Sequence, residues 1–279
     1  MAEKIIETNG VEICTETFDN PTDPCILLMM GATASMIWWD VEFCKLLAAQ
    51  NRFVIRYDNR DVGRSSVFEE LNYDVVDMAA DAFGVLDFYQ IENAHLAGMS
   101  LGGMIAQIMA LQQPDRILSL TLISSSVWAN RPDLPEMDPK FLEYHGRAAT
   151  LNWTDKAEVQ DYMVGGWKVV GGSGRKFDVV RTSQLASQEI DRANSLISMF
   201  NHAQLGGGEA YYNRSSEIKV PVLIIHGTED PVLPYPHALA LAEAFPEGKL
   251  IKLEGAGHEL HKQDWELVIK EIISLTTES

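Results

Sequence analysis

Residues 95–104 read HLAGMSLGGM, an apolar run that leads into a serine flanked by glycines. The pattern Gly-x-Ser-x-Gly is weak alone, but here a strand-like segment precedes it and a helix-like segment follows it. We therefore expect Ser100 on a sharp strand-to-helix turn, where glycines two positions either side permit close approach of the chains. Its hydroxyl would stand at a helix N-terminus, and the amide of Leu101 would point to where an oxyanion forms.

This stretch has two other interpretations. Ser100 could simply cap a helix in a tight turn. The glycines could also belong to a phosphate-binding loop, but no Gly-Lys-Ser/Thr follows them. A nucleophilic serine is favoured because a base and an acid occur where this chemistry needs them.

Short apolar runs and amphipathic segments alternate on both sides of this turn. Runs typical of strands buried on both faces span residues 25–30, 53–57, 94–98, 118–123, 220–225 and 249–253. Helical patterns fall at residues 40–49, 74–88, 101–111, 236–245 and 264–275. Residues 5–18 predict a hairpin around Asn9-Gly10. The alternation predicts an α/β fold with a mostly parallel central sheet flanked by helices.

One stretch breaks the alternation. Residues 127–216 begin with a proline cluster and continue with helical pieces separated by glycine-rich segments, without a convincing strand pattern. We interpret residues 127–216 as a helical cap inserted into a core domain formed by residues 1–126 and 217–279.

His258 and Asp230 are the candidate base and acid. An imidazole can take a serine proton and return it, and His258 follows the last predicted strand in EGAGH, residues 254–258. Asp230 follows another predicted strand in HGTEDP, residues 226–231, and would orient the imidazole. Surface-loop and turn-capping roles are the alternatives, and Glu229 is the nearest substitute for the acid. The chain order of nucleophile, acid and base is the one expected of this type of sheet.

The remaining histidines are weaker candidates, and no metal site is predicted. His226 should pack at the end of a buried strand, and His202 falls in a predicted helix. The pair His258 and His261 lacks the four-residue spacing of the zinc pattern His-Glu-x-x-His. We expect neither a metal nor another cofactor.

Charge, cysteine content and apolar runs limit the kinds of molecule that this protein is expected to bind. The 279 residues carry 22 basic and 40 acidic side chains, a net charge of −18, which disfavours nucleic acid and anionic membranes. Three cysteines without CxxC spacing argue against a disulfide framework. The N-terminus lacks a signal-peptide pattern and no run of about 18 apolar residues occurs. We expect a cytoplasmic protein that acts on a small molecule, with a homodimer left open.

Taken together, these motifs resemble the α/β-hydrolase superfamily over most of the chain outside residues 127–216. The matching segments are MMGA at 29–32, YDNRDVGRS at 57–65, the serine turn, GTEDP at 227–231 and GAGH at 255–258. They look most similar to aclacinomycin methylesterase-like and lactonase-like serine esterases. The resemblance implies an oxyanion hole built from the main-chain amides of Ala32 and Leu101. Met30 stands where the family usually carries histidine, so the support of this loop should differ.

The resemblance also implies a pocket beneath the cap. Candidate lining residues are Gly31, Trp38, Trp128 and Trp167, although packing of the cap on the core is the favoured explanation for any single aromatic side chain. The implied activity is hydrolysis of a carboxylic ester, lactone or thioester of a small, mainly apolar substrate through an acyl-enzyme. Two alternatives stay open: a non-hydrolytic small-molecule receptor, and a carbon-carbon hydrolase or perhydrolase with the same three residues.

Overall fold

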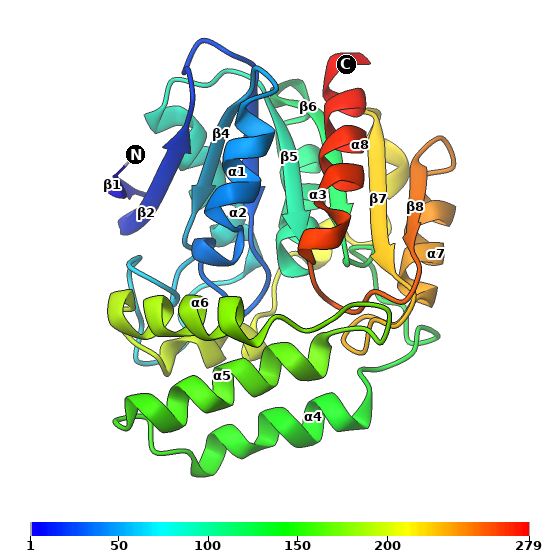
Figure 1. The fold of residues 1–279 in the computed structure, drawn as a ribbon. Coiled ribbons are helices and arrows are strands. Elements are labelled where there is room, and N and C mark those ends of the chain that lie inside the picture. The colour runs from blue at the N-terminus through cyan, green and yellow to red at the C-terminus, as the bar shows by residue number, and fades with distance from the viewer. Residues whose placement is uncertain (1, 279) are drawn as a thin grey trace.

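The computed structural model describes residues 2–278 as a central sheet with helices on both faces and a tier of helices along one edge (Figure 1). The eight strands lie in the order β1-β2-β4-β3-β5-β6-β7-β8. They are β1 (Lys4–Thr8), β2 (Val11–Phe18), β3 (Cys25–Met29), β4 (Phe53–Tyr57), β5 (Ala94–Met99), β6 (Ile117–Ile123), β7 (Val222–Gly227) and β8 (Lys249–Leu253). The predicted α/β class is confirmed.

The first two strands form the predicted hairpin. Asn9 and Gly10 have φ values of 48° and 76°, as a primed two-residue turn requires. β2 pairs antiparallel with β4, and every later pairing from β4 to β8 is parallel. The carboxyl ends of β3 to β8 therefore meet along one edge of the sheet, which we call the carboxyl edge.

The sequence places most strands within two residues of their observed bounds. β4 and β8 have the predicted bounds, whereas β7 begins at Val222 instead of residue 220. Pro221 has no N–H for the ladder, so it stands just before the strand. These parallel strands are buried almost throughout, which is why their apolar runs are continuous.

Helices cover both faces of the sheet. Their bounds are α1 (Val41–Ala48), α2 (Val75–Phe88), α3 (Leu101–Gln112), α7 (Pro236–Ala244) and α8 (Trp265–Glu278), with short 3-10 helices η1 (Met36–Trp38), η2 (Pro114–Arg116) and η7 (Lys262–Asp264). Phe43 of α1 packs with Val268 of α8 in one cluster, while Met78, Ile105 and Leu241 from α2, α3 and α7 belong to the other.

Residues 124–221, which we call the insertion, connect β6 to β7. They form α4 (Pro139–Gly146), α5 (Lys156–Val170), α6 (Val179–Arg192), η3 (Arg147–Thr150), η4 (Ser198–Gln204), η5 (Glu209–Tyr211) and η6 (Ser215–Glu217), and contain no strand. Figure 1 shows α4, α5 and α6 as a layer across the carboxyl edge. The division at residues 127 and 216 stays a prediction.

The remaining features concern the cysteines and the apolar character of the helices. Cys14, Cys25 and Cys44 are buried free thiols. In residues 2–278, none of the helices combines the length and the apolar character needed to cross a membrane.

Candidate active site

Ser100 occupies a strained turn between β5 and α3. Its φ of 54° and ψ of −120° lie in a region that residues other than glycine rarely adopt. Its N–H donates to the carbonyl of Ile123 at 2.9 Å, and its carbonyl accepts from Ser125 Oγ at 2.8 Å. Both main-chain groups of Ser100 are therefore held by β6 and the residues after it, which keeps the strained turn in place.

The glycines that flank Ser100 are required because neighbouring main-chain atoms leave no room for a Cβ. A Cβ on Gly98 would lie 2.2 Å from the carbonyl oxygen of Gly102, and a Cβ on Gly102 would lie 2.2 Å from that of Met29. Such distances are shorter than any real contact, so only glycine fits either position. The pattern around Ser100 is thus explained by the close approach of α3 to β5 and β3.

Asp230 and His258 lie together at the carboxyl edge, after β7 and β8 respectively. His258 Nδ1 and Asp230 Oδ2 are 2.7 Å apart. Asp230 Oδ1 accepts from the N–H groups of Val232 and Leu233, each at 2.8 Å. Burial alone would raise the pKa of Asp230, but His258 and the N–H of Leu233 hold it below its ordinary value. The N–H of His258 donates to the carbonyl of Val170 in α5, so the insertion helps to place the imidazole.

Ser100 shares this edge with the pair. The carboxyl end of β5 lies in the same parallel array as those of β7 and β8. Within residues 2–278 no hydrogen bond joins Ser100 Oγ to the His258 imidazole, so the proton transfer between them belongs to the proposal below. Catalytic hydrogen bonds often tighten only when substrate binds.

His226 also belongs to this cluster, although the sequence pointed only to packing. Its Nε2 donates to the carbonyl of Leu233 at 2.7 Å and lies 3.4 Å from Asp230 Oδ2. Its Nδ1 is buried and has no hydrogen-bond partner among residues 2–278. Burial lowers the pKa of His226, so this ring packs as a neutral neighbour of the carboxylate.

The two predicted oxyanion donors flank the serine turn. Leu101 is the first residue of α3, where an N–H has no partner within the helix. Ala32 is exposed in the loop after β3, and a Cβ on the preceding Gly31 would lie 3.0 Å from that of Ser100. Thr33 follows with a φ of 64°. These positions suit main-chain donors on either side of the Ser100 hydroxyl.

The predicted pocket tryptophans have different surroundings. Trp38 of η1 and Trp167 of α5 stack with ring centroids 4.2 Å apart, which joins the core to the insertion. Trp128 instead donates through Nε1 to the carbonyl of Gly208 at 2.9 Å and packs against Tyr212. These two contacts lie within the insertion, while the N–H of Trp128 donates to Gln107 of α3 and the side chain packs against the core cluster.

The RDVGR segment, residues 60–64, forms separate structural contacts. Arg60 binds Asp81 through two hydrogen bonds of 2.5 and 2.9 Å, and Arg64 binds Glu3. Asp61 accepts from uncharged donors, including the Tyr73 hydroxyl. Arg60, Asp61 and Arg64 therefore each contact a different part of the fold.

A buried charged cluster joins α6 to the core, and no sequence pattern indicated it. Arg192 pairs with Asp58 at 2.7 Å and with Glu3 at 2.9 Å. Glu189, one turn earlier, accepts from Ser35 Oγ. Burial, together with the nearby charge of Asp58, raises the pKa of Glu189 to about 7.

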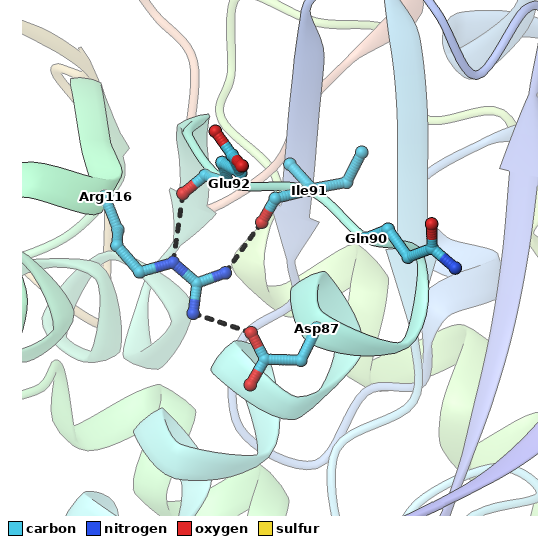
Figure 2. Close-up of a pocket in the computed structure, with 5 residues that line it drawn as sticks. All are labelled: Asp87, Gln90, Ile91, Glu92 and Arg116. Atoms are coloured by element: carbon cyan, nitrogen blue, oxygen red, sulfur yellow. Dashed lines mark hydrogen bonds and ion pairs between the residues drawn. The ribbon is translucent and has the colours of Figure 1, made fainter.

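The hollow in Figure 2 lies at the opposite edge of the sheet, next to the starts of β5 and β6. There Arg116 pairs with Asp87 and donates to the carbonyls of Ile91 and Glu92, at 2.6 to 3.0 Å. These partners engage all three nitrogens of the guanidinium, so the hollow holds a structural contact.

Known proteins resemble this chain in sequence and in fold. A family model described as the alpha/beta hydrolase fold matches residues 24–264. The chain is 31% identical to rhodomycin D methylesterases from Streptomyces sp. (strain C5) and Streptomyces peucetius, and each alignment covers 93% of both proteins. It superposes on an enol-lactonase from Burkholderia xenovorans LB400 with a TM-score of 0.76 at 19% identity, covering 98% of this chain and 100% of that one. The relatives are hydrolytic enzymes of the esterase type, as the sequence predicted, and the chain belongs to the α/β-hydrolase family.

Proposed function

We propose that this protein is a serine hydrolase that cleaves a carboxylic ester of a small, mainly apolar substrate. The observation that carries the proposal is the hydrogen-bonded pair of Asp230 and His258 at the same sheet edge as the strained Ser100. Ester chemistry is favoured over lactone or thioester hydrolysis because two relatives that are 31% identical to this chain are named methylesterases.

The reaction would follow from the roles of these three side chains. Asp230 accepts a hydrogen bond from the Nδ1–H of His258. The lone pair of Nε2 is then free to take the proton of Ser100 as its oxygen attacks the ester carbonyl. His258 then gives that proton to the leaving alcohol. A water molecule, deprotonated by the same imidazole, attacks the acyl-enzyme and releases the acid.

The main-chain amides of Ala32 and Leu101 would bind the oxyanion of the tetrahedral intermediate. Each is a neutral donor held by the fold, so little reorganisation is needed when negative charge develops. Loss of one such donor typically slows catalysis by ~100-fold or more.

We further propose that residues 127–216 act as a cap over the site. The stacked Trp38 and Trp167 place an apolar aromatic surface where core and insertion meet. Such a surface suits an apolar acyl or ring group.

A Ser100→Ala variant tests the proposed function. We expect it to lose turnover of p-nitrophenyl esters and labelling by a fluorophosphonate, because no other nucleophile replaces the hydroxyl. The melting temperature should stay close to that of the wild type, and the exposed Ser216→Ala should keep full activity. Unchanged esterase activity in Ser100→Ala would contradict the proposal. A ligand-induced thermal shift without turnover in the wild type would instead support a receptor.

A further inference from the structure

His202 is a buried histidine of the insertion that contacts the core loop carrying Ala32. It lies in η4, is 6% exposed, and is more than 160 residues away from that loop in sequence. Its Nδ1 accepts from the N–H of Thr33 at 2.9 Å, and its Nε2 contacts the carbonyl of Arg60 at 2.7 Å. One ring therefore bridges two core segments.

The two contacts define the protonation state of the ring. The Thr33 N–H can only donate, so Nδ1 must carry a lone pair, and the Arg60 carbonyl can only accept, so Nε2 must carry the proton. Burial lowers the pKa of His202, which keeps the ring neutral. The imidazole acts as a fixed acceptor facing the loop.

The backbone at the contact is strained. Thr33 has a φ of 64°, which is uncommon for a residue other than glycine and rare for a β-branched one. Such a conformation is energetically unfavourable and persists only where the surroundings hold it. The neighbouring Met30 is buried and apolar, so its side chain offers this loop no comparable hydrogen bond. The N–H of Thr33 immediately follows Ala32, whose amide direction depends on the same backbone.

We propose that His202 is a positioning residue that fixes the loop at Ala32–Thr33 and so aligns the Ala32 amide for the developing oxyanion. The inference rests on the proposed function, since it assigns a support to the same site. It also means that the insertion contributes to catalysis from outside the substrate pocket, because the loop has this support only while η4 is docked.

The expected kinetic effect is specific. An oxyanion donor acts mainly in the transition state, so a misaligned donor lowers kcat and changes KM little. A residue with a purely structural role would lower the melting temperature and the fraction of active enzyme, but leave kcat per active site unchanged.

Three substitutions separate the two contacts. His202→Phe keeps a ring of similar size and removes both hydrogen bonds. His202→Asn can present an amide oxygen near the position of Nδ1, whereas His202→Gln can present an amide N–H near that of Nε2. Ser198→Ala is the matched control, since Ser198 lies in the same 3-10 helix and donates to the carbonyl of Asp61 instead.

The experiment measures kcat and KM for a p-nitrophenyl ester, normalised by fluorophosphonate active-site titration. Amide hydrogen exchange across residues 31–35 is measured alongside. We expect His202→Phe to lose ~10- to 100-fold in kcat with faster exchange in this loop, His202→Asn to recover more activity than His202→Gln, and Ser198→Ala to match the wild type.

The outcomes distinguish the inference from the proposed function. If the wild type hydrolyses esters through Ser100 and His202→Phe keeps its kcat per active site, the positioning role is wrong and the proposed function stands. Equal loss in His202→Asn and His202→Gln would also overturn the role assigned to the Thr33 contact. If the wild type turns over no ester, the proposed function fails, and the catalytic role of His202 fails with it.

Discussion

The two carboxylate oxygens of Asp230 accept hydrogen bonds from different groups. Oδ1 receives two main-chain N–H groups from the following turn, while Oδ2 faces His258 Nδ1. The two N–H donors fix the orientation of the carboxylate independently of the histidine. The carboxylate therefore always presents Oδ2 to the imidazole as an acceptor. Because Nδ1 must then carry the proton, Nε2 is the nitrogen that can act as a base.

An Asp230→Asn substitution should reverse the hydrogen bond to His258. The two N–H donors require the amide oxygen at the Oδ1 position, so the amide NH2 would face His258 and force its proton onto Nε2. The base is then blocked, and we expect kcat to fall by about 10⁴-fold with the fold intact. Steady-state kinetics of Asp230→Asn and the wild type would test this.

Glu229→Gln is the matched control, because Glu229 is exposed and binds Ser173 instead of the imidazole. It should keep most of the activity. A large loss in Glu229→Gln with little loss in Asp230→Asn would reassign the acid to Glu229.

The residues of the candidate site differ in how well their roles could be predicted from the sequence. Ser100 and Asp230 lie in short patterns beside predicted strands, so local sequence was enough to mark them as candidates. His202 showed no such signal, because its partners lie 142 and 169 positions away and the ring sits in an irregular 3-10 segment. His226 was expected to pack, which it does, but its closeness to Asp230 depends on the turn after β7.

At the scale of elements, the junction of β5 and α3 is the most constrained part of the fold. The helix approaches the strand so closely that side-chain atoms are excluded at Gly98 and Gly102. The close contact sets the strained turn at Ser100. The sequence revealed this element well, because the close approach requires glycine at residues 98 and 102, on either side of the serine.

Gly98→Ala should therefore destabilise the protein by about 3 kcal/mol or more, since the new Cβ would overlap main-chain atoms of Gly102 and Gly103. Urea unfolding followed by circular dichroism gives the free energy. Gly146→Ala is the control: Gly146 has a helical φ of −57° and nothing within 4 Å of an added Cβ. It should be neutral or stabilising by up to ~1 kcal/mol. Equal stability of Gly98→Ala and the wild type would contradict the close packing.

Over the whole molecule, the core was predictable and the docking of the insertion was not. Parallel strands and their helices carry periodic apolar patterns that reflect one shared core. The insertion binds the core through dispersed polar and charged contacts, including Arg192 with Asp58, Arg181 with Asp40 and Arg175 with Asp264. Each pair joins segments more than 80 residues apart, so neither periodicity nor spacing in the sequence indicates it.

One of these docking groups should make stability depend on pH. The pKa of Glu189 is raised to about 7 in the folded protein, above its ordinary value of 4.5. Between these values the folded state binds a proton that the unfolded state has lost, so stability falls by ~1.4 kcal/mol per pH unit as pH rises. The contribution is present below pH 4.5 and is lost as pH rises through 7.

Glu189→Gln removes this titration and keeps a neutral side chain beside Ser35. Arg192 retains Asp58 and Glu3 as partners. Relative to the wild type, the variant should gain on the order of 3 kcal/mol of unfolding free energy between pH 4.5 and 8.5, measured by urea unfolding at each pH. Buried histidines titrate in both proteins, so their contribution cancels in the difference. Glu217→Gln is the control and should change little over this range, because Arg214 lowers the pKa of the exposed Glu217 and the linked change in stability lies below pH 4.5. A flat difference for Glu189→Gln would mean that Glu189 is charged throughout this range and that α6 docks through a fully ionised cluster.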